Sequence, residues 1–131
     1  MTNNQPLPQD LANFIQTYEK LANKRNFDLL IPLISERAIF WFSDGSYTGI
    51  QEIRSAFERT WTSLPNEIYS ISNINLLLSE KSSAVICYTF TSISVSNGIE
   101  STFKGRGTNI LQKFDGSWKI IHEHLSLMPK K

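Results

Sequence analysis

His122 and His124 are the first residues of this chain to suggest chemistry. They are its only histidines, and imidazole changes charge near neutral pH, so either ring can bind or protonate a small polar ligand. Side chains two positions apart on a strand point to the same face of a sheet, which would bring both rings into one site. The alternative carries equal weight, because each can be a core or interface histidine satisfied by hydrogen bonds.

The partners of the two histidines follow from a predicted hairpin. Asp115-Gly116 is a strong two-residue hairpin signal, and a type I′ turn there pairs the residues on either side of it. Counting outward from the turn places Asn109 opposite His122, on the same side as His124. Arg106 would lie on the other side unless a bulge at one of its flanking glycines turns it inward. The inward pairs are then Leu111–Ile120, Asn109–His122 and Gly107–His124.

The same face lacks the side chains that a metal ion or a nucleophile would need. Two histidines require a third ligand, and the nearest carboxylate, Glu123, is expected on the opposite face. The single cysteine, Cys87, lies in an apolar run, where a thiol is ordinarily a buried small hydrophobe. The sequence therefore predicts neither a metal nor a cofactor.

Helices in the first half and strands in the second must position these residues. A first helix follows Pro8, where apolar residues repeat with the spacing of one helix face. Asn26 can cap a second helix, which Pro32 should kink or shorten. Thr48 and Gln51 form a capping box for a third. Aromatic and period-two segments predict strands at residues 38–42, 68–78, 84–95, 101–113 and 118–128.

Helices followed by an antiparallel meander indicate an α+β fold, in which three helices cover one face of a curved sheet and leave a cup. Aromatic residues are available to line this cup, with Trp41 and Tyr47 near its mouth. Trp41 and Trp61 are expected to contact a ligand, since indole combines apolar area with one donor, although a structural role is at least as common. A tyrosine such as Tyr18 on an apolar helix face is more often a core residue with its hydroxyl at the rim.

Composition argues against several kinds of partner. Lysine and arginine number 13 against 12 acidic residues, and no stretch concentrates one sign, so neither a nucleic acid nor an anionic membrane is an expected partner. The sequence has no leader-like segment and no apolar run of about 20 residues, which predicts a cytoplasmic protein. A chain of 131 residues is expected to form one domain.

The segment Gly105–Ser126 resembles the terminal hairpin of SnoaL-like proteins, a branch of the nuclear-transport-factor-2-like superfamily that includes the association domain of calcium/calmodulin-dependent kinase II. The order of elements over about residues 8–128 is also similar, including Gly49 at the start of the third helix. The resemblance implies that residues 1–131 form a single SnoaL-like domain, a cone of three N-terminal helices on a strongly curved antiparallel sheet. It does not imply one activity, because the superfamily hosts isomerases, dehydratases, cyclases and non-catalytic binders.

The resemblance also marks where this chain departs from its relatives. In the ketosteroid-isomerase branch, Tyr18 matches a catalytic tyrosine, but the base and acid positions fall at or beside Phe42 and Ile110, which cannot transfer protons. In the kinase association domain, pocket arginines hold acidic ligands, and the arginine of this hairpin aligns with Asn109. Arg106 can replace it if the backbone bulges, which would favour a ligand with a carboxylate.

Two functions remain open at this point. The first is a dimeric module that binds a small neutral or acidic organic molecule. The second is a cofactor-independent lyase, isomerase or cyclase in which His122 or His124 acts as acid or base and Tyr18 polarises a carbonyl. Apolar residues on both faces of the strand near Cys87 predict the homodimer, through the outer face of the sheet. The expected ligand contacts are Tyr18, Trp41, Tyr47, Trp61, Arg106, Asn109, His122 and His124.

Overall fold

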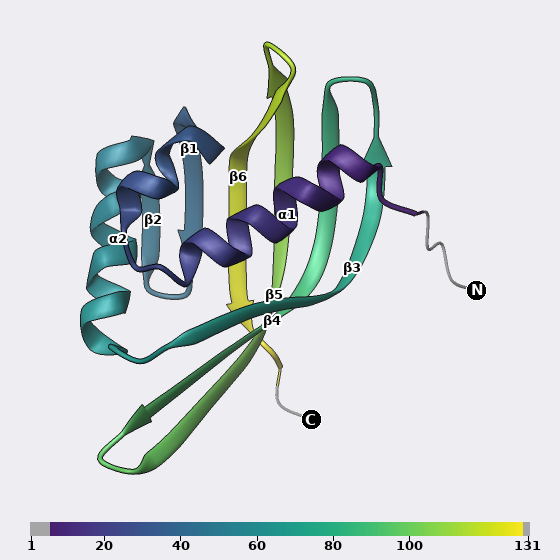
Figure 1. Cartoon of the computed structure of the whole chain (residues 1–131). Coiled ribbons are helices and arrows are strands. Elements are labelled where there is room, and N and C mark those ends of the chain that lie inside the picture. Colours follow the sequence, from purple (N-terminus) through teal and green to yellow (C-terminus); the bar gives the residue numbers. More distant parts are fainter. Residues whose placement is uncertain (1–5, 130–131) are drawn as a thin grey trace.

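The computed structural model describes residues 6–129, whose strands form one sheet with helices packed on it (Figure 1). The strand order in the sheet is β2-β1-β6-β5-β4-β3. The elements in chain order are α1 (Gln9–Ala22), the 3₁₀ turns η1 (Phe27–Leu29) and η2 (Ile31–Leu33), β1 (Ile34–Phe42), β2 (Gly45–Thr48), α2 (Gly49–Ser63), β3 (Ile68–Ser79), β4 (Ser83–Ser96), β5 (Ile99–Phe114) and β6 (Ser117–Leu127).

The helices form where the sequence places them, with two differences. Asn26 caps η1 by accepting a hydrogen bond from the backbone N–H of Asp28, but the second helix consists only of two 3₁₀ turns, with Pro32 in the second. At the start of α2, the backbone N–H of Thr48 donates to Glu52 Oε1 at 2.8 Å, so the expected capping partner Gln51 is wrong by one residue. Among the described residues, no helix has the length and apolar character needed to cross a membrane.

The sheet is mixed, not wholly antiparallel as expected. β3 to β6 form the predicted antiparallel meander, but β6 returns beside β1 in the same direction and pairs with it in parallel. The short strand β2, which pairs with β1 across a tight turn, was not predicted. β4 and β5 bend along their length, which gives the sheet its concave face (Figure 1).

A bulge in the last hairpin changes the predicted register. Leu111 pairs with Ile120 as expected, but the next pair is Ile110 with His122, so Ile121 is an extra residue on β6. Beyond a bulge of one residue, every side chain of the strand changes face. Glu123 therefore pairs with Asn109 and faces the concave side, whereas both histidines face the outer side.

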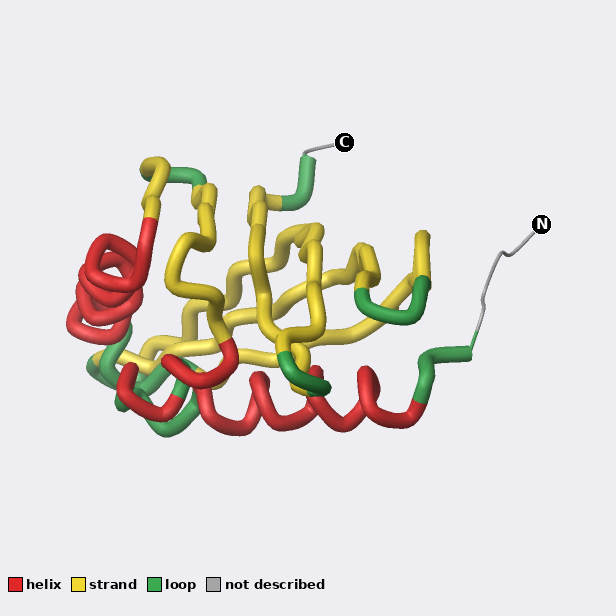
Figure 2. Tube along the Cα trace, turned by 90° about the horizontal axis from the view of Figure 1, so that it is seen from above, coloured by secondary structure: helices red, strands yellow, loops and turns green. Residues whose placement is uncertain are grey.

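Helix α1 lies along the concave face of the sheet (Figure 2). Its apolar side is buried against the inward residues of β4, β5 and β6. The start of the helix is tied to the β5–β6 hairpin through Asp10, which accepts a hydrogen bond from Trp118 Nε1 at 3.1 Å and pairs with Lys113 Nζ at 2.8 Å. The largest fully buried apolar side chains are Leu11, Phe27, Leu30, Ile34, Phe40, Ile53, Ile86, Leu111 and Ile120.

Candidate functional site

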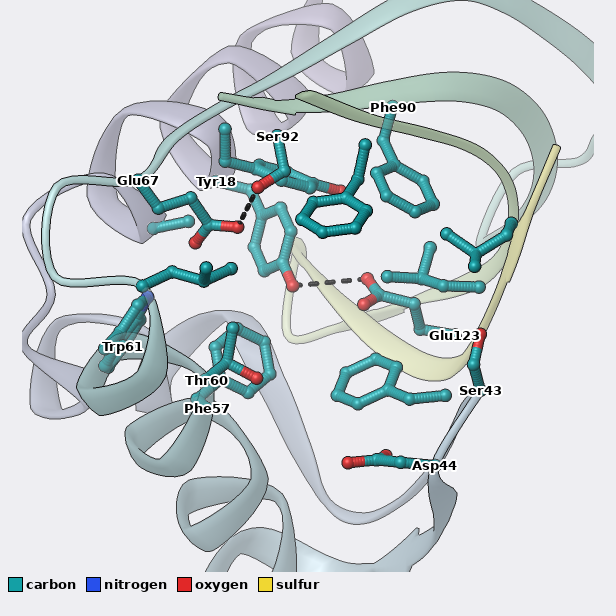
Figure 3. A pocket seen from close by; sticks show the side chains of 17 residues that line it. Tyr18, Ser43, Asp44, Phe57, Thr60, Trp61, Glu67, Phe90, Ser92 and Glu123 are labelled. Carbon is teal, nitrogen blue, oxygen red and sulfur yellow. Dashed lines mark hydrogen bonds between the residues drawn. The ribbon is translucent and has the colours of Figure 1, made fainter. Parts of the chain in front are cut away.

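A cavity of about 570 Å³ lies between α1, α2 and the concave face of the sheet (Figure 3). Its walls are mostly apolar and aromatic, and its volume falls in the range of pockets that hold small organic molecules. The aromatic side chains that line it are Tyr18, Phe42, Phe57, Trp61, Tyr69, Phe90 and Phe103.

Glu123 is the buried polar residue of this cavity. Its side chain is on β6 and only 1% of the residue is exposed to solvent. Its Oε1 atom accepts two hydrogen bonds, from the Tyr18 hydroxyl and from Asn109 Nδ2, both at 3.2 Å. Within residues 6–129, no hydrogen bond reaches its second oxygen, Oε2. Glu123 also lines the cavity, so Oε2 is available to a bound molecule (Figure 3).

Burial raises the pKa of Glu123 to about 7, even though the hydrogen bonds from Asn109 and Tyr18 favour the ionised form. Removal of a carboxylate from water penalises its charge more than two hydrogen bonds compensate here. Glu123 therefore exchanges its proton near neutral pH, which an exposed glutamate does not do.

Three tyrosines lie near this carboxyl group, of which Tyr18 and Tyr88 are buried and Tyr69 is partly buried, and Tyr18 is the one that donates a hydrogen bond to it. Desolvation, followed by the negative charge of Glu123, raises the pKa of Tyr18, Tyr69 and Tyr88 well above the usual value, so all three remain neutral at physiological pH. The Tyr88 hydroxyl donates to Asn109 Oδ1 at 2.8 Å. This bond orients the Asn109 amide so that its NH₂ group points to Glu123.

Two glycines of β5 make room for aromatic rings of β4, Phe90 in the cavity wall and Tyr88 beside Asn109. A Cβ atom at Gly107 would lie 2.4 Å from Tyr88 Cζ, and one at Gly105 would lie 2.4 Å from the Phe90 ring. Carbon atoms do not approach that closely. The two rings on β4 therefore occupy the space that side chains at Gly105 and Gly107 of β5 would need. The register is regular from Gly105 to Gly107, and the bulge considered beside Arg106 is absent there.

The mouth of the cavity carries two further carboxylates. Glu67 accepts a hydrogen bond from the buried Ser92 hydroxyl, and its main-chain carbonyl accepts one from the Arg25 guanidinium. Asp44 accepts a hydrogen bond from the Tyr47 hydroxyl at 2.8 Å and lies 3.6 Å from Arg59. The charge of Asp44 is therefore compensated locally by a cation.

Four of the residues predicted from the sequence lie at or near this cavity. Tyr18 and Trp61 line it, and Asn109 is bonded to Glu123 directly behind it. Tyr47 lies at the rim, where its ring packs 5.7 Å from Phe42 and its hydroxyl holds Asp44. Their contact with a ligand remains a prediction.

The other four lie on the opposite face of the sheet. The expected position of His122, His124 and Trp41 in the cup was therefore wrong, and the bulge that would have turned Arg106 inward is absent. The Trp41 ring packs 5.0 Å from His122 and 5.4 Å from His124, and His122 Nδ1 lies 2.7 Å from the carbonyl oxygen of Ile39. Arg106 is exposed on the same outer side. The cause is the bulge at Ile121 for the histidines, while Trp41 pairs with His124 across the parallel strands and shares its face.

The composition of the cavity wall also differs from the one that favoured an acidic ligand. The wall was expected to lack carboxylates and to carry Arg106 and two histidines, and both expectations were wrong. The described lining contains Asp44, Glu67 and Glu123 and no arginine, lysine or histidine. Nothing in this cavity would compensate the charge of a bound carboxylate.

Sequence reasoning missed Glu123, although one signal was available. Strict alternation from Trp118 turns His122 and His124 inward and Leu125 outward, whereas a bulge at the adjacent apolar pair Ile120-Ile121 turns Glu123 and Leu125 inward. The second arrangement buries a leucine and a carboxyl group, and the first buries two histidines. The pattern alone did not decide between them.

A strongly bent sheet that encloses a cavity with helices on its concave side defines a nuclear-transport-factor-2-like α+β protein. Residues 8–129 match the model of the calcium/calmodulin dependent protein kinase II association domain, and the chain belongs to this family. A search of the curated proteins finds no match.

Solved structures confirm the fold. A Xanthomonas campestris protein, proposed to be such an association domain, is 24% identical with a TM-score of 0.81, over 99% of this chain and 97% of the other. A protein of the nuclear-transport-factor-2-like superfamily from Salmonella enterica is 21% identical with a TM-score of 0.79, over 93% of this chain and 91% of the other. A Novosphingobium aromaticivorans protein, proposed to be a scytalone dehydratase, is 16% identical with a TM-score of 0.81, over 92% and 83%.

Proposed function

We propose that this protein binds a small, largely apolar organic molecule in the cavity above Glu123. The observation that carries the proposal is a buried carboxyl group whose free oxygen Oε2 faces an aromatic cavity of about 570 Å³. Such cavities bind by burial of apolar area, while a few placed polar atoms fix the orientation of the ligand. Here Oε2 is the atom that orients the ligand, and the aromatic rings supply the apolar contact.

A variant that fills the cavity tests this proposal. Thr60 lines the mouth from an exposed position on α2, so Thr60→Trp should occlude the cavity with little effect on the core. Thr62→Trp is the matched control, because Thr62 is exposed on the same helix and does not line the cavity. Fragments that raise the melting temperature of the wild-type protein and of Thr62→Trp should lose that effect in Thr60→Trp. Equal stabilisation of all three proteins would refute the cavity as the binding site.

A second candidate function is proton transfer by Glu123, as in a lyase or isomerase. A general acid or base works best when its pKa is near the working pH, and Glu123 combines a pKa of about 7 with a free oxygen on the cavity. In this proposal Glu123 replaces the histidines, and Tyr18 supports the carboxyl group instead of a substrate carbonyl. Glu123→Gln should lower the rate of any turnover found by about 10²–10⁴-fold. A variant that retains full rate would contradict this role.

We also propose that the protein forms a homodimer through the outer face of the sheet. A row of side chains crosses that face from β1 to β3 in register, and its apolar members lie partly or largely exposed. Figure 2 shows α1 on the opposite side of the sheet, where it leaves this face uncovered. Contiguous exposed apolar area of this kind is typical of protein interfaces. The row consists of Ile39, His122, Ile110, Val85 and Leu78.

A further inference from the structure

The charged side chains of the cavity all carry the same sign. Asp44 has Arg59 as its counter-ion, but among the described residues Glu67 and Glu123 make no ion pair. The Arg25 guanidinium donates to the main-chain carbonyl of Glu67 and forms no ion pair with its carboxylate. A ligand that enters this cavity therefore meets negative charge that the protein leaves uncompensated.

Glu123 is surrounded by neutral groups on every side. Tyr18 faces it from α1, Tyr69 and Tyr88 from β3 and β4, and Asn109 from β5. Phe40 is its apolar partner on β1. A buried carboxylate without a counter-ion is costly, and a cation placed at its free oxygen removes much of that cost.

The walls of the cavity also suit a positive charge. The face of an aromatic ring carries negative potential and attracts ammonium groups within about 6 Å of its centre. Figure 3 shows the rings of Tyr18, Phe57 and Phe90 around the space in front of Glu123. The same rings provide apolar area for the rest of a ligand, so charge and body can be accommodated together.

We propose that the ligand is an amine: an ammonium group bound at Glu123 Oε2, carried on an apolar body that packs against the aromatic walls. This inference rests on the proposed small-molecule function and names its ligand class. An N–H of the ammonium donates to Oε2, while Oε1 keeps its bonds from Tyr18 and Asn109. Glu67 adds a second negative group toward the mouth, where a diamine or a hydroxylated amine would find a further acceptor.

The proposal predicts how affinity depends on pH. An ammonium group favours ionised Glu123, whose pKa is about 7 in the free protein. The ionised fraction rises from about one tenth at pH 6 to about nine tenths at pH 8, so the affinity for an amine should rise about tenfold over that range. Binding at pH 6 should release close to one proton. An uncharged ligand of the same shape should bind with little pH dependence.

The experiment uses three ligands that share a phenyl ring on a four-carbon chain and differ in the head group and its charge: 4-phenylbutylamine, 4-phenylbutanol and 4-phenylbutyrate. Isothermal titration of the full chain at pH 6 and pH 8, in two buffers of different ionisation enthalpy, gives the affinity and the proton count. The amine should bind at least about tenfold more tightly than the alcohol at pH 8, and the carboxylate should be weakest. This preference should disappear in Glu123→Gln and persist in the control His124→Gln, whose side chain is exposed on the outer face.

The outcomes separate this inference from the function on which it rests. If the alcohol binds as tightly as the amine and Thr60→Trp abolishes both, the cavity binds small molecules but the amine assignment is wrong. If none of the three ligands binds, both proposals fail. The proton count in the wild-type protein does not depend on any variant, so amine binding at pH 6 without proton release also overturns the assignment.

Discussion

Gly107→Ala is the substitution whose effect follows most directly from the geometry. The added Cβ atom would lie 2.4 Å from Tyr88 Cζ and 2.7 Å from its hydroxyl oxygen. Carbon contacts are ordinarily about 3.5–4.0 Å, so the buried Tyr88 ring must move by about 1 Å. The backbone of β5 cannot move away instead, because Gly107 is buried and is held by regular pairing with β4 and β6.

The size of the effect can be worked from three contributions. Overpacking of a buried ring costs about 1–3 kcal/mol, and loss of the Tyr88–Asn109 hydrogen bond between buried groups costs about 1–3 kcal/mol. Alanine has a lower backbone entropy than glycine in the unfolded chain, which offsets about 0.5–1 kcal/mol of this cost. Gly107 has no positive φ, so no backbone strain adds to this. We expect a net loss of about 3 kcal/mol in the free energy of unfolding.

Urea unfolding followed by circular dichroism measures this loss. Arg106→Ala is the matched control, since Arg106 is the next residue on the strand and is exposed on the other face, where a change of about 0.5 kcal/mol or less is expected. In a Tyr88→Leu background, Gly107→Ala should cost less than about 1 kcal/mol, because the ring that the Cβ atom meets is gone. An equal cost in both backgrounds would refute the steric argument, as would a Gly107→Ala protein as stable as the wild type.

Two further predictions concern stability and assembly. Because the pKa of Glu123 is raised from 4.5 to about 7 by folding, the folded protein holds a proton between these values that the unfolded chain has lost; stability should fall by about 3 kcal/mol from pH 5 to pH 8. Urea unfolding should show this fall in the wild type and not in Glu123→Gln, and equal pH slopes would contradict it. Trp41→Asp places a charge on the outer face, where Trp41 is 44% exposed, and should dissociate the proposed dimer in sedimentation equilibrium. A wild-type protein that is monomeric at micromolar concentration would refute the interface itself.

The elements of the fold were largely readable from the sequence because they depend on local patterns. The predicted strands at 68–78, 84–95 and 101–113 differ from the observed ones by at most two residues at either end. The amphipathic face of α1 and the cap at Asn26 are likewise properties of neighbouring residues. The four-residue strand β2 was missed because Gly45 and Ser46 have turn chemistry, and only pairing with β1 makes them a strand.

The candidate site was less predictable, because it depends on whether β6 contains one extra residue. The bulge at Ile121 exchanges the faces of His122 and Glu123, and no local rule distinguishes a strand that contains it from one that does not. What decides is the environment on the two faces: Tyr18 and Asn109 can satisfy a carboxyl group inside, while Trp41 packs against both histidines outside. These partners come from other parts of the chain, so the choice is made by the tertiary structure.

The contacts of α1 have a consequence for how this chain reaches its native state. Tyr18 meets Glu123 at a sequence separation of 105 residues, and Asp10 meets Trp118 at a separation of 108. Helix α1 is made well before β6, so these two contacts form only when β6 is present, and the apolar side of α1 lacks part of its cover until then. Long-range contacts of this kind slow folding, and apolar surface stays exposed until they form. Chains that stop before β6 should consequently be aggregation-prone, because α1 then lacks the partners that β6 supplies.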